Sequence, residues 1–224
     1  MKAHTFLISF FTAHFKRHET KKFRSTYILP PPTVIWGMIG AIFGVRREVL
    51  IDFVKKHNIT VGAELCNIKG LAIEKATLMP WDKERRHYIR AVEDFEFLIE
   101  PTFRIAVYAE DGLVEELKRR IEKLNFEFDI YGGISDCFLK DIENEKHAKF
   151  EMKKEVRGMI PVYLMDGYSK ILKDCRVAKV LYLNTFFYQG FNVEFRTKET
   201  IKTINGIAVW DINDIARFRK GYFS

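Results

Sequence analysis

The sequence FRSTYILPPPTVIWGMIGAIFG, residues 23–44, decides how the first half of the chain folds. It contains three of the six prolines as one run: Pro30, Pro31 and Pro32. Proline fixes φ and has no backbone N–H, so an extended segment ends at this run and a helix can begin there. Thr33 is placed to cap that helix, and apolar residues then recur at helical spacing over 34–42. The stretch therefore predicts a strand that turns at the prolines into a helix.

Three glycines follow the prolines: Gly37, Gly40 and Gly44. The first two lie inside the predicted helix, where each destabilises the helix by roughly 1 kcal/mol relative to alanine. We therefore expect a packed strand or a ligand to approach the backbone at Gly37 and Gly40, and valine to be poorly tolerated at either position. Gly44 marks the end of the helix.

The composition is that of a folded chain without a membrane span. Of the 224 residues, 47% are hydrophobic and 14% aromatic, enough for a substantial core in one large domain or two small ones. The apolar runs stay below the roughly 18 residues of a membrane span, and a basic cluster replaces the cleavage site of a signal peptide. We expect a soluble, cytoplasmic protein. Three cysteines without CxxC spacing predict buried thiols.

The formal net charge of +7 is concentrated in the first quarter of the chain. Residues 1–60 contain ten Lys/Arg and three Asp/Glu, whereas residues 61–224 contain 27 of each kind. A local positive field of this kind favours the phosphate backbone of a nucleic acid as the partner. Charge alone does not decide this, because many soluble proteins have lysine-rich surfaces.

A basic and aromatic segment, HFKRHETKKFR at residues 14–24, precedes the proline turn. Single-stranded RNA is held by cations along its backbone and by aromatic faces under its bases, and this segment combines both residue types. We predict RNA contacts from the segment and from the tyrosine that follows it: Lys16, Arg17, His18, Lys21, Lys22, Arg24 and Tyr27. The alternative is a solvated loop whose phenylalanines point into the core.

Periodicity predicts a β-α-β-β-α-β order, the ferredoxin-like (RRM-like) arrangement of an α+β protein. The expected elements are a strand within 3–15, the helix after the prolines, a short helix at 47–57, a hairpin of strands at 60–67 and 71–78, strands at 95–98 and 102–109, a helix at 113–124 and a short strand at 126–131. We place one domain at 1–145. Residues 146–224 are expected to form a β-rich subdomain, without a clear helix, packed on the first.

Two segments resemble a known family. The order FR, TY, PPPT, W-G-x-I-G and F-G within residues 23–44 is similar to the N-terminal signature of the CRISPR-associated RAMP superfamily. Within it, the resemblance is to the handle-binding small subunit of type I Cascade complexes, the fifth Cas family. Residues 124–137, LNFEFDIYGGISDC, are similar to a later segment of that family in which a short strand ends in a glycine turn.

The resemblance implies a non-catalytic RNA-binding protein, and we expect no cofactor and no metal. It implies that CRISPR RNA is held by its repeat-derived 5′ handle, in a complex with a backbone RAMP subunit and a large subunit. It also implies an inserted β-hairpin thumb that contacts the guide RNA, with these candidates near its tip: Trp81, Arg85, Arg86, His87 and Arg90. An ordinary surface loop is the alternative for that segment.

Residues suited to metal or catalytic chemistry are poorly arranged in the sequence. His14 and His18 are four residues apart without a third ligand nearby, and the sequence lacks P-loop, HExxH and GxSxG motifs. One branch of the resembled family cleaves the guide precursor with a tyrosine, a lysine and a histidine. A metal-independent endoribonuclease is therefore an alternative, with these residues: Tyr27, Lys146 and His147. A general single-strand RNA-binding module on the same fold is a third.

Overall fold

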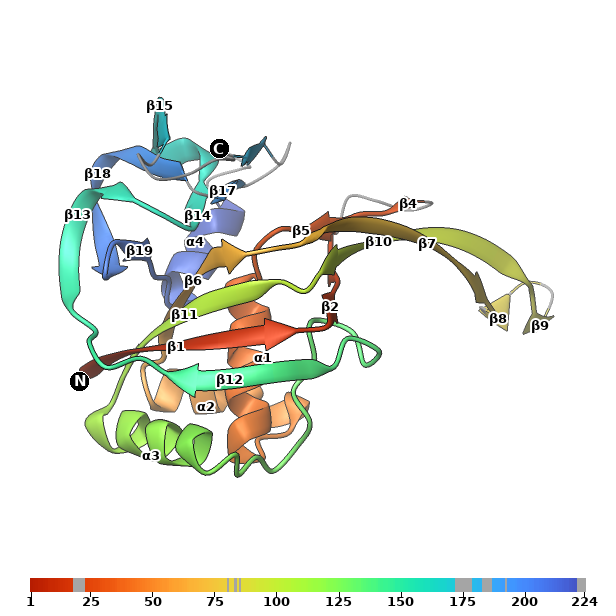
Figure 1. Cartoon of the computed structure of the whole chain (residues 1–224), viewed down its shortest axis with the longest axis horizontal. Helices are drawn as coiled ribbons and strands as arrows, with labels where there is room; N and C mark the ends of the chain where they lie inside the picture. The colour runs from red at the N-terminus through yellow and green to blue at the C-terminus, as the bar shows by residue number, and fades with distance from the viewer. Residues whose placement is uncertain are drawn as a thin grey trace.

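A computed structural model describes residues 1–17, 23–79, 81–82, 84, 86–171, 179–182, 187–191 and 193–220. The predicted ferredoxin-like unit is confirmed, with these elements: β1 (Lys2–Phe10), α1 (Pro32–Phe43), β6 (Thr60–Asn67), β11 (Thr102–Ala109), α3 (Asp111–Glu122) and β12 (Leu139–Asn144). The strands form a sheet in the order β12-β1-β11-β6, with every neighbouring pair antiparallel. Helices α1 and α3 lie against this sheet (Figure 1).

The first helix begins where the proline run predicts it. Helix α1 starts at Pro32 with Pro31 as its N-cap residue, and it ends at Gly44, whose φ is 74°. The cap expected from Thr33 is wrong: among the described residues, the start of α1 has no side-chain capping hydrogen bond. Burial of its apolar stripe holds the helix to the sheet instead, through Ile35, Trp36, Ile39 and Ile42.

The two interior glycines of α1 have different surroundings. A Cβ added at Gly40 would lie 2.8 Å from Cδ1 of Leu50, so a close approach is confirmed at this position, although the neighbour is a side chain of helix α2 (Leu50–Lys56) and not a strand. A Cβ added at Gly37 would meet no described atom within 4 Å outside the backbone of its own helix, so the packed strand expected there is wrong, and approach of a ligand stays a prediction. Only Gly40 is therefore explained by packing inside the molecule.

Gly37→Ala is expected to raise the free energy of unfolding by about 1 kcal/mol, because alanine is the better helix former and its Cβ has room. Thermal unfolding should show Tm rising by about 2–4 °C. Gly40→Ala is the matched control, and its Tm should fall because Leu50 has to move. Equal changes in the two variants would contradict this difference.

The strand at 71–78 pairs with a different partner from the one expected. Strand β7 (Gly70–Leu78) pairs antiparallel with β10 (Ala91–Ile99) over its whole length. The predicted hairpin of 60–67 with 71–78 is wrong, because β6 and β7 belong to different sheets. Strands β7 and β10 form the expected inserted hairpin, which projects from the body as an arm (Figure 1).

Two further predictions are wrong. Residues 126–131 form a loop, and the last strand of the unit is β12. The alternation of this segment suggested a strand, but Phe128 is 47% exposed, so the pattern does not mark a buried face. The C-terminal part contains a helix, α4 (Ile212–Lys220), in which Ile212 and Ile215 contact the core. Two residues one turn apart are too short a stripe to stand out in the sequence.

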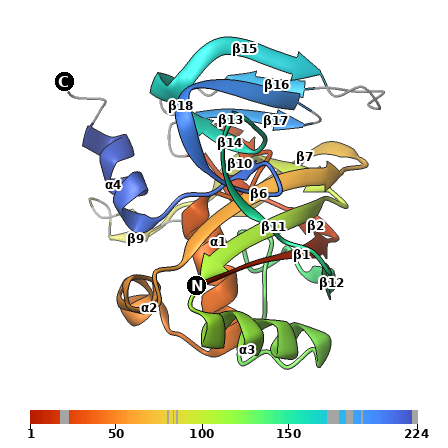
Figure 2. The ribbon, with the colours of Figure 1, turned by 90° about the vertical axis from the view of Figure 1, so that its left-hand side faces the viewer.

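The C-terminal part is built onto the ferredoxin-like sheet. Strands β17 (Phe187–Phe191) and β14 (Met159–Pro161) extend that sheet beyond β6, and β13 (Phe150–Val156), β18 (Val193–Ile204) and β15 (Met165–Ile171) form a second sheet (Figure 2). The backbones of Val61 and Trp210 exchange hydrogen bonds of 3.1 and 2.8 Å between the two regions. The division near residue 145 stays a prediction.

The other elements are short. They are β2 (Thr12–Ala13), β3 (Phe15–Lys16), β4 (Phe23–Arg24) and β5 (Thr26–Tyr27) before α1; η1 (Arg47–Val49) and α2 (Leu50–Lys56) after it; β8 (Trp81–Asp82) and β9 (His87–Tyr88) in the arm; and η2 (Val162–Leu164), β16 (Lys179–Tyr182) and β19 (Ile207–Ala208) near the C-terminus. The described helices include none that is both long and apolar enough to cross a membrane.

Gln189 of β17 holds the chain just before the proline run. Its side chain is fully buried, and its Oε1 accepts hydrogen bonds from the backbone N–H groups of Ile28 and Leu29, at 3.0 and 3.3 Å. These two groups come directly before prolines that cannot continue a sheet. The last third of the chain therefore helps to fix the turn that the sequence places at residues 30–32.

Candidate nucleic-acid interface

The segment between β1 and α1, residues 11–31, crosses the root of the arm, where β10 leaves the body at residues 94–99. We call it the crossing segment. Strand β2 pairs antiparallel with β10 at Ala13 and Leu98, and β4 pairs parallel with β10 at Phe23 and Asp94. Strand β3 pairs with β5. The basic segment of the sequence is therefore attached to the root of the arm at both of its ends.

The structure places part of the predicted cationic set at this root. Lys16 of β3 is exposed, and Arg17 is half-buried, with its backbone N–H bonded to the carbonyl oxygen of Ser25 at 3.1 Å. The predicted contacts between β3 and β4 lie outside the described residues: His18, Lys21 and Lys22. Lys16 is thus the exposed cation of this set that the structure describes most clearly.

Arg24 is tied to the arm. Its Nε forms an ion pair with Oε2 of Glu93, and its guanidinium carbon lies 4.9 Å from the centre of the Phe95 ring. Glu96 adds a second tie, because its Oε2 accepts the backbone N–H of Thr26 at 3.1 Å. Arg24 therefore fixes the arm to the crossing segment, and its role in RNA contact stays a prediction.

Tyr27 and His14 are packed inside the root. Tyr27 is 8% exposed and belongs to the core, a placement suited to packing against the proline turn. His14 is 1% exposed, its Nδ1 lies 2.8 Å from the carbonyl oxygen of Glu96, and burial lowers its pKa. The imidazole is therefore neutral near pH 7. Among the described residues, no three His, Cys, Asp or Glu side chains are grouped to hold a metal ion.

The tip of the arm presents two exposed aromatic rings. Trp81 and Tyr88 face each other across β8 and β9, are 52% and 63% exposed, and have ring centres 5.1 Å apart with planes at 73°. The other predicted tip residues described here are exposed cations and a histidine: Arg86, His87 and Arg90. Arg85 lies outside the described residues. Tyr88 was missed at the sequence level, although its pairing with Trp81 across the turn was a usable signal.

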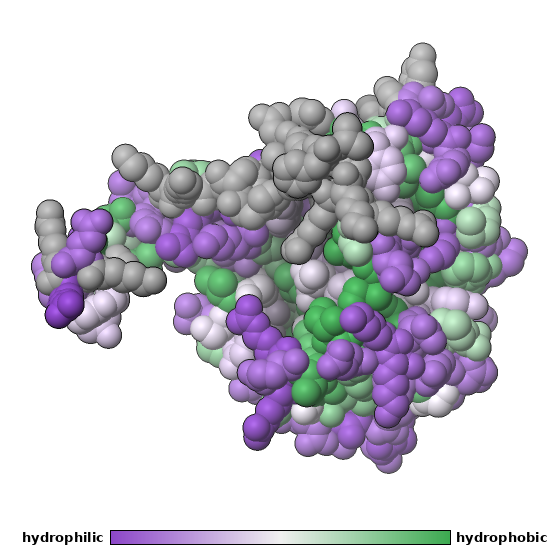
Figure 3. All heavy atoms as spheres, turned by 180° about the vertical axis from the view of Figure 1, so that it is seen from behind, coloured by the Kyte–Doolittle hydropathy of each residue, from purple (hydrophilic) through white to green (hydrophobic). Residues whose placement is uncertain are grey.

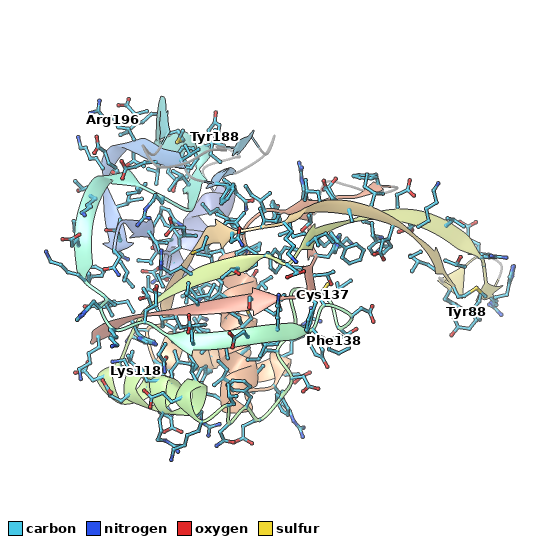
Figure 4. The ribbon with its side chains drawn as sticks, in the orientation of Figure 1. Tyr88, Lys118, Cys137, Phe138, Tyr188 and Arg196 are labelled. Atoms are coloured by element: carbon cyan, nitrogen blue, oxygen red, sulfur yellow. The ribbon has the colours of Figure 1, made fainter. Side chains whose placement is uncertain are left out.

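The arm stands away from the body, with Tyr88 at its far end (Figure 4). Seen from behind, hydrophilic side chains cover much of its visible surface (Figure 3). Aromatic rings within such a polar surface are the exception, because large rings are usually buried. The combination of exposed rings and nearby cations fits stacking on bases and contact with phosphates.

Most of the basic residues of 1–60 lie in one of two places, the segment between β1 and α1 or the surroundings of α2. Four exposed cations, Arg46, Arg47, Lys55 and Lys56, lie around η1 and α2. Figure 1 places α2 low on the body, away from the arm and its root. The net charge of +7 is therefore not one continuous patch, and only part of it lies beside the arm.

The residues of the ribonuclease alternative come from separate places. Lys146 and His147 are exposed and follow β12 at the edge near the N-terminus, whereas Tyr27 on β5 lies by the root of the arm (Figure 1). General acid–base catalysis requires both groups within hydrogen-bond reach of one scissile bond. The described structure does not bring these three side chains together.

The fold and this surface define a ferredoxin-like protein with an inserted hairpin arm, whose root is crossed by a segment rich in basic and aromatic residues. A family model described as "CRISPR-associated protein (Cas_Cas5)" matches residues 6–158. This is most of the chain, so the chain belongs to this family of CRISPR-associated proteins. The comparison with curated proteins found no match.

Solved structures add likenesses of fold. A chain of a "CRISPR RNA-guided surveillance complex" has a TM-score of 0.51 and 13% identity, with 97% of this chain and 98% of that chain covered. A chain described as "Crystal structure of Cas protein" has a TM-score of 0.40 and 18% identity, covering 62% and 64%. A chain of a type III-B Cmr-beta complex bound to target RNA has a TM-score of 0.41 and 11% identity, covering 97% and 93%. The first likeness shows a shared fold.

Proposed function

We propose that this protein is a non-catalytic, cytoplasmic subunit of a Cascade-type interference complex, where it holds the repeat-derived 5′ handle of the CRISPR RNA. Membership of the CRISPR-associated family supports the setting. The exposed pair Trp81 and Tyr88 at the tip of the arm is the observation that carries the RNA contact. The proposed protein partners are a backbone RAMP subunit and the large subunit.

The proposed RNA path runs from the crossing segment to the tip of the arm. Lys16 and the neighbouring cations would attract the phosphates at the root, and the rings at the tip would stack on bases. Arg24 and Glu96 hold the arm to the crossing segment, so both contact regions are carried on one connected element. Binding at two points of one rigid element costs less conformational entropy, because the protein surface does not have to be ordered on binding.

Replacing Trp81 and Tyr88 together with alanine is expected to weaken binding of repeat handle RNA by about 10- to 100-fold, because stacking on an aromatic ring contributes about 1–3 kcal/mol per base. Binding can be measured by filter retention or fluorescence anisotropy. Tyr88→Phe keeps the ring and should bind normally.

A matched control removes two equally exposed apolar side chains from strands β7 and β10, which form the shaft of the arm. The substitutions are Ile73→Ala and Val92→Ala, at side chains that are 62% and 61% exposed. RNA affinity should be unchanged in this control. If the shaft variant loses as much affinity as the tip variant, the tip has no special role in stacking.

The purified chain is expected to leave cognate repeat RNA intact in EDTA, because the candidate acid and base groups are separated. The assay is denaturing electrophoresis of labelled repeat RNA after long incubation. A single discrete cut that disappears in Tyr27→Phe or His147→Ala would put the endoribonuclease in first place.

A further inference from the structure

A second surface of exposed apolar side chains lies on the loop that joins α3 to β12, away from the tip of the arm. Leu124, Phe128 and Phe138 are 64%, 47% and 59% exposed, although side chains of this size are usually buried. Together with Tyr131 they line one hollow of about 380 Å³. Phe11 adjoins it, because its backbone N–H bonds to the carbonyl oxygen of Phe138 at 3.2 Å, and Phe11 is itself 56% exposed. We call these five residues the loop face.

The loop face is preformed. The backbone N–H of Gly132 donates to the carbonyl oxygen of Cys137 at 2.7 Å, and the N–H of Cys137 donates to the carbonyl oxygen of Ile134 at 3.0 Å. These two hydrogen bonds close the loop into a tight turn. The rings of Tyr131 and Phe138 meet edge to face, with centres 6.0 Å apart. Figure 4 shows Phe138 on this loop, away from Tyr88 at the tip of the arm. Exposed rings on a fixed backbone bind at a small entropic cost.

The loop itself carries acidic side chains. Residues 124–138 contain three Asp/Glu and no Lys/Arg, and one of these acids, Glu127, pairs with Arg120 of α3. Asp129 and Asp136 are exposed on the loop, and Asp129 lines the hollow. A phosphate backbone is repelled by such a field, whereas a segment carrying lysine and arginine is attracted.

A lysine beside this surface is held in an ion pair, with a carboxylate that it shares with a second lysine. Lys140 lies 5.9 Å above the centre of the Phe11 ring, but its Nζ forms a 2.5 Å ion pair with Glu100. Glu100 also pairs with Lys69, and hydrogen bonds from these two lysines lower its pKa to about 2. Glu100 is therefore ionised at any physiological pH and keeps Lys140 paired.

We propose that the loop face docks a partner protein. The docking segment of that partner carries apolar side chains flanked by Lys or Arg. Aromatic rings dominate binding at the centre of protein interfaces, and oppositely charged rims select the partner. The RNA-binding surface differs, because there the exposed rings stand among cations. The inference rests on the proposed function in one respect: the partner is sought among the other subunits of the same complex.

The test uses this chain and, as probes, the purified backbone and large subunits encoded with it. Phe128→Ser with Phe138→Ser should weaken binding to one of these subunits at least tenfold by biolayer interferometry. Asp129→Lys with Asp136→Lys should weaken the same contact and leave every ring in place. Ile73→Ser with Val92→Ser, on the shaft of the arm, is the control for loss of exposed apolar surface and should bind the subunits normally.

Handle RNA affinity and Tm are measured on the same preparations, so that this proposal and the proposed function are judged separately. Both should stay at the wild-type level in the loop-face variants. Unchanged subunit affinity in either variant, or a wild-type chain that binds neither subunit, would overturn the docking role. A selective loss of RNA affinity in the ring variant would overturn it as well, by assigning the loop face to RNA.

Discussion

Replacing Lys16, Arg17, Lys21 and Lys22 with alanine is expected to weaken binding of handle RNA by about 10²-fold at physiological salt. The variant makes fewer phosphate contacts, so fewer counterions are released from the RNA on binding. The slope of log affinity against log salt should become shallower by about 3, since each contact to a single strand contributes roughly 0.7. Arg24 is kept in this variant, because its ion pair with Glu93 supports the arm. Affinity is measured over a salt series.

The matched control removes the same number of cations from the other basic region: Arg46, Arg47, Lys55 and Lys56. These residues belong to the same basic quarter of the sequence but surround α2. A loss confined to the first variant would show a local contact rather than an effect of net charge. Equal losses in the two variants, or none in either, would mean that the crossing segment makes no specific contact with the RNA.

Gly133→Ala is expected to lower the free energy of unfolding by about 3 kcal/mol or more, through backbone strain and a direct clash. Gly133 has a φ of +102°, which side chains with a Cβ rarely adopt, and an added Cβ would lie 2.1 Å from the carbonyl oxygen of His14. Gly132 beside it accepts the backbone N–H of His14 at 2.8 Å. This contact holds the crossing segment at the root of the arm, so RNA binding should fall together with Tm.

Gly112→Ala provides the control, because an added Cβ at that position meets no described atom within 4 Å. Its Tm and RNA affinity should stay at or above wild type. A Gly133→Ala protein with a wild-type Tm would show that the contact with His14 contributes little to the fold. Denaturant unfolding followed by circular dichroism compares the variants on one scale.

The elements that local patterns specify strongly were predictable. The run Pro30–Pro32 fixes a strand end and a helix start by geometry alone, and α1 begins there. The apolar stripe of the helix predicted at 113–124 repeats over three turns, and α3 buries four residues of it. Such signals need no knowledge of the rest of the chain.

Pairing between distant segments could not be predicted in the same way. The segment after Lys69 resembled the second half of a hairpin with 60–67, but β7 pairs with β10 over nine residues of each strand. Gln189 gave no signal either, since its hydrogen bonds to residues 28 and 29 span about 160 positions of sequence. Long-range contacts depend on the folded chain and not on local periodicity.

The candidate site was predictable in residue type and less so in placement. Trp81 and the cations beside it lie at an exposed tip, as a basic and aromatic hairpin implies. Tyr27 was grouped with the RNA contacts because of its position in the sequence, yet its ring is packed in the core. The sequence shows which residue types are present, whereas exposure decides which of them a ligand reaches.

The most direct measurement is the identity of the RNA that the chain retains. The protein is co-expressed with a repeat–spacer array and the separate enzyme that processes it, purified at moderate salt, and its RNA is sequenced from the 5′ end. We predict discrete RNAs that begin with the repeat-derived handle, and their loss in the Trp81→Ala, Tyr88→Ala variant. Retained RNA of random sequence, or no retained RNA from a folded protein, would contradict a role in holding the handle.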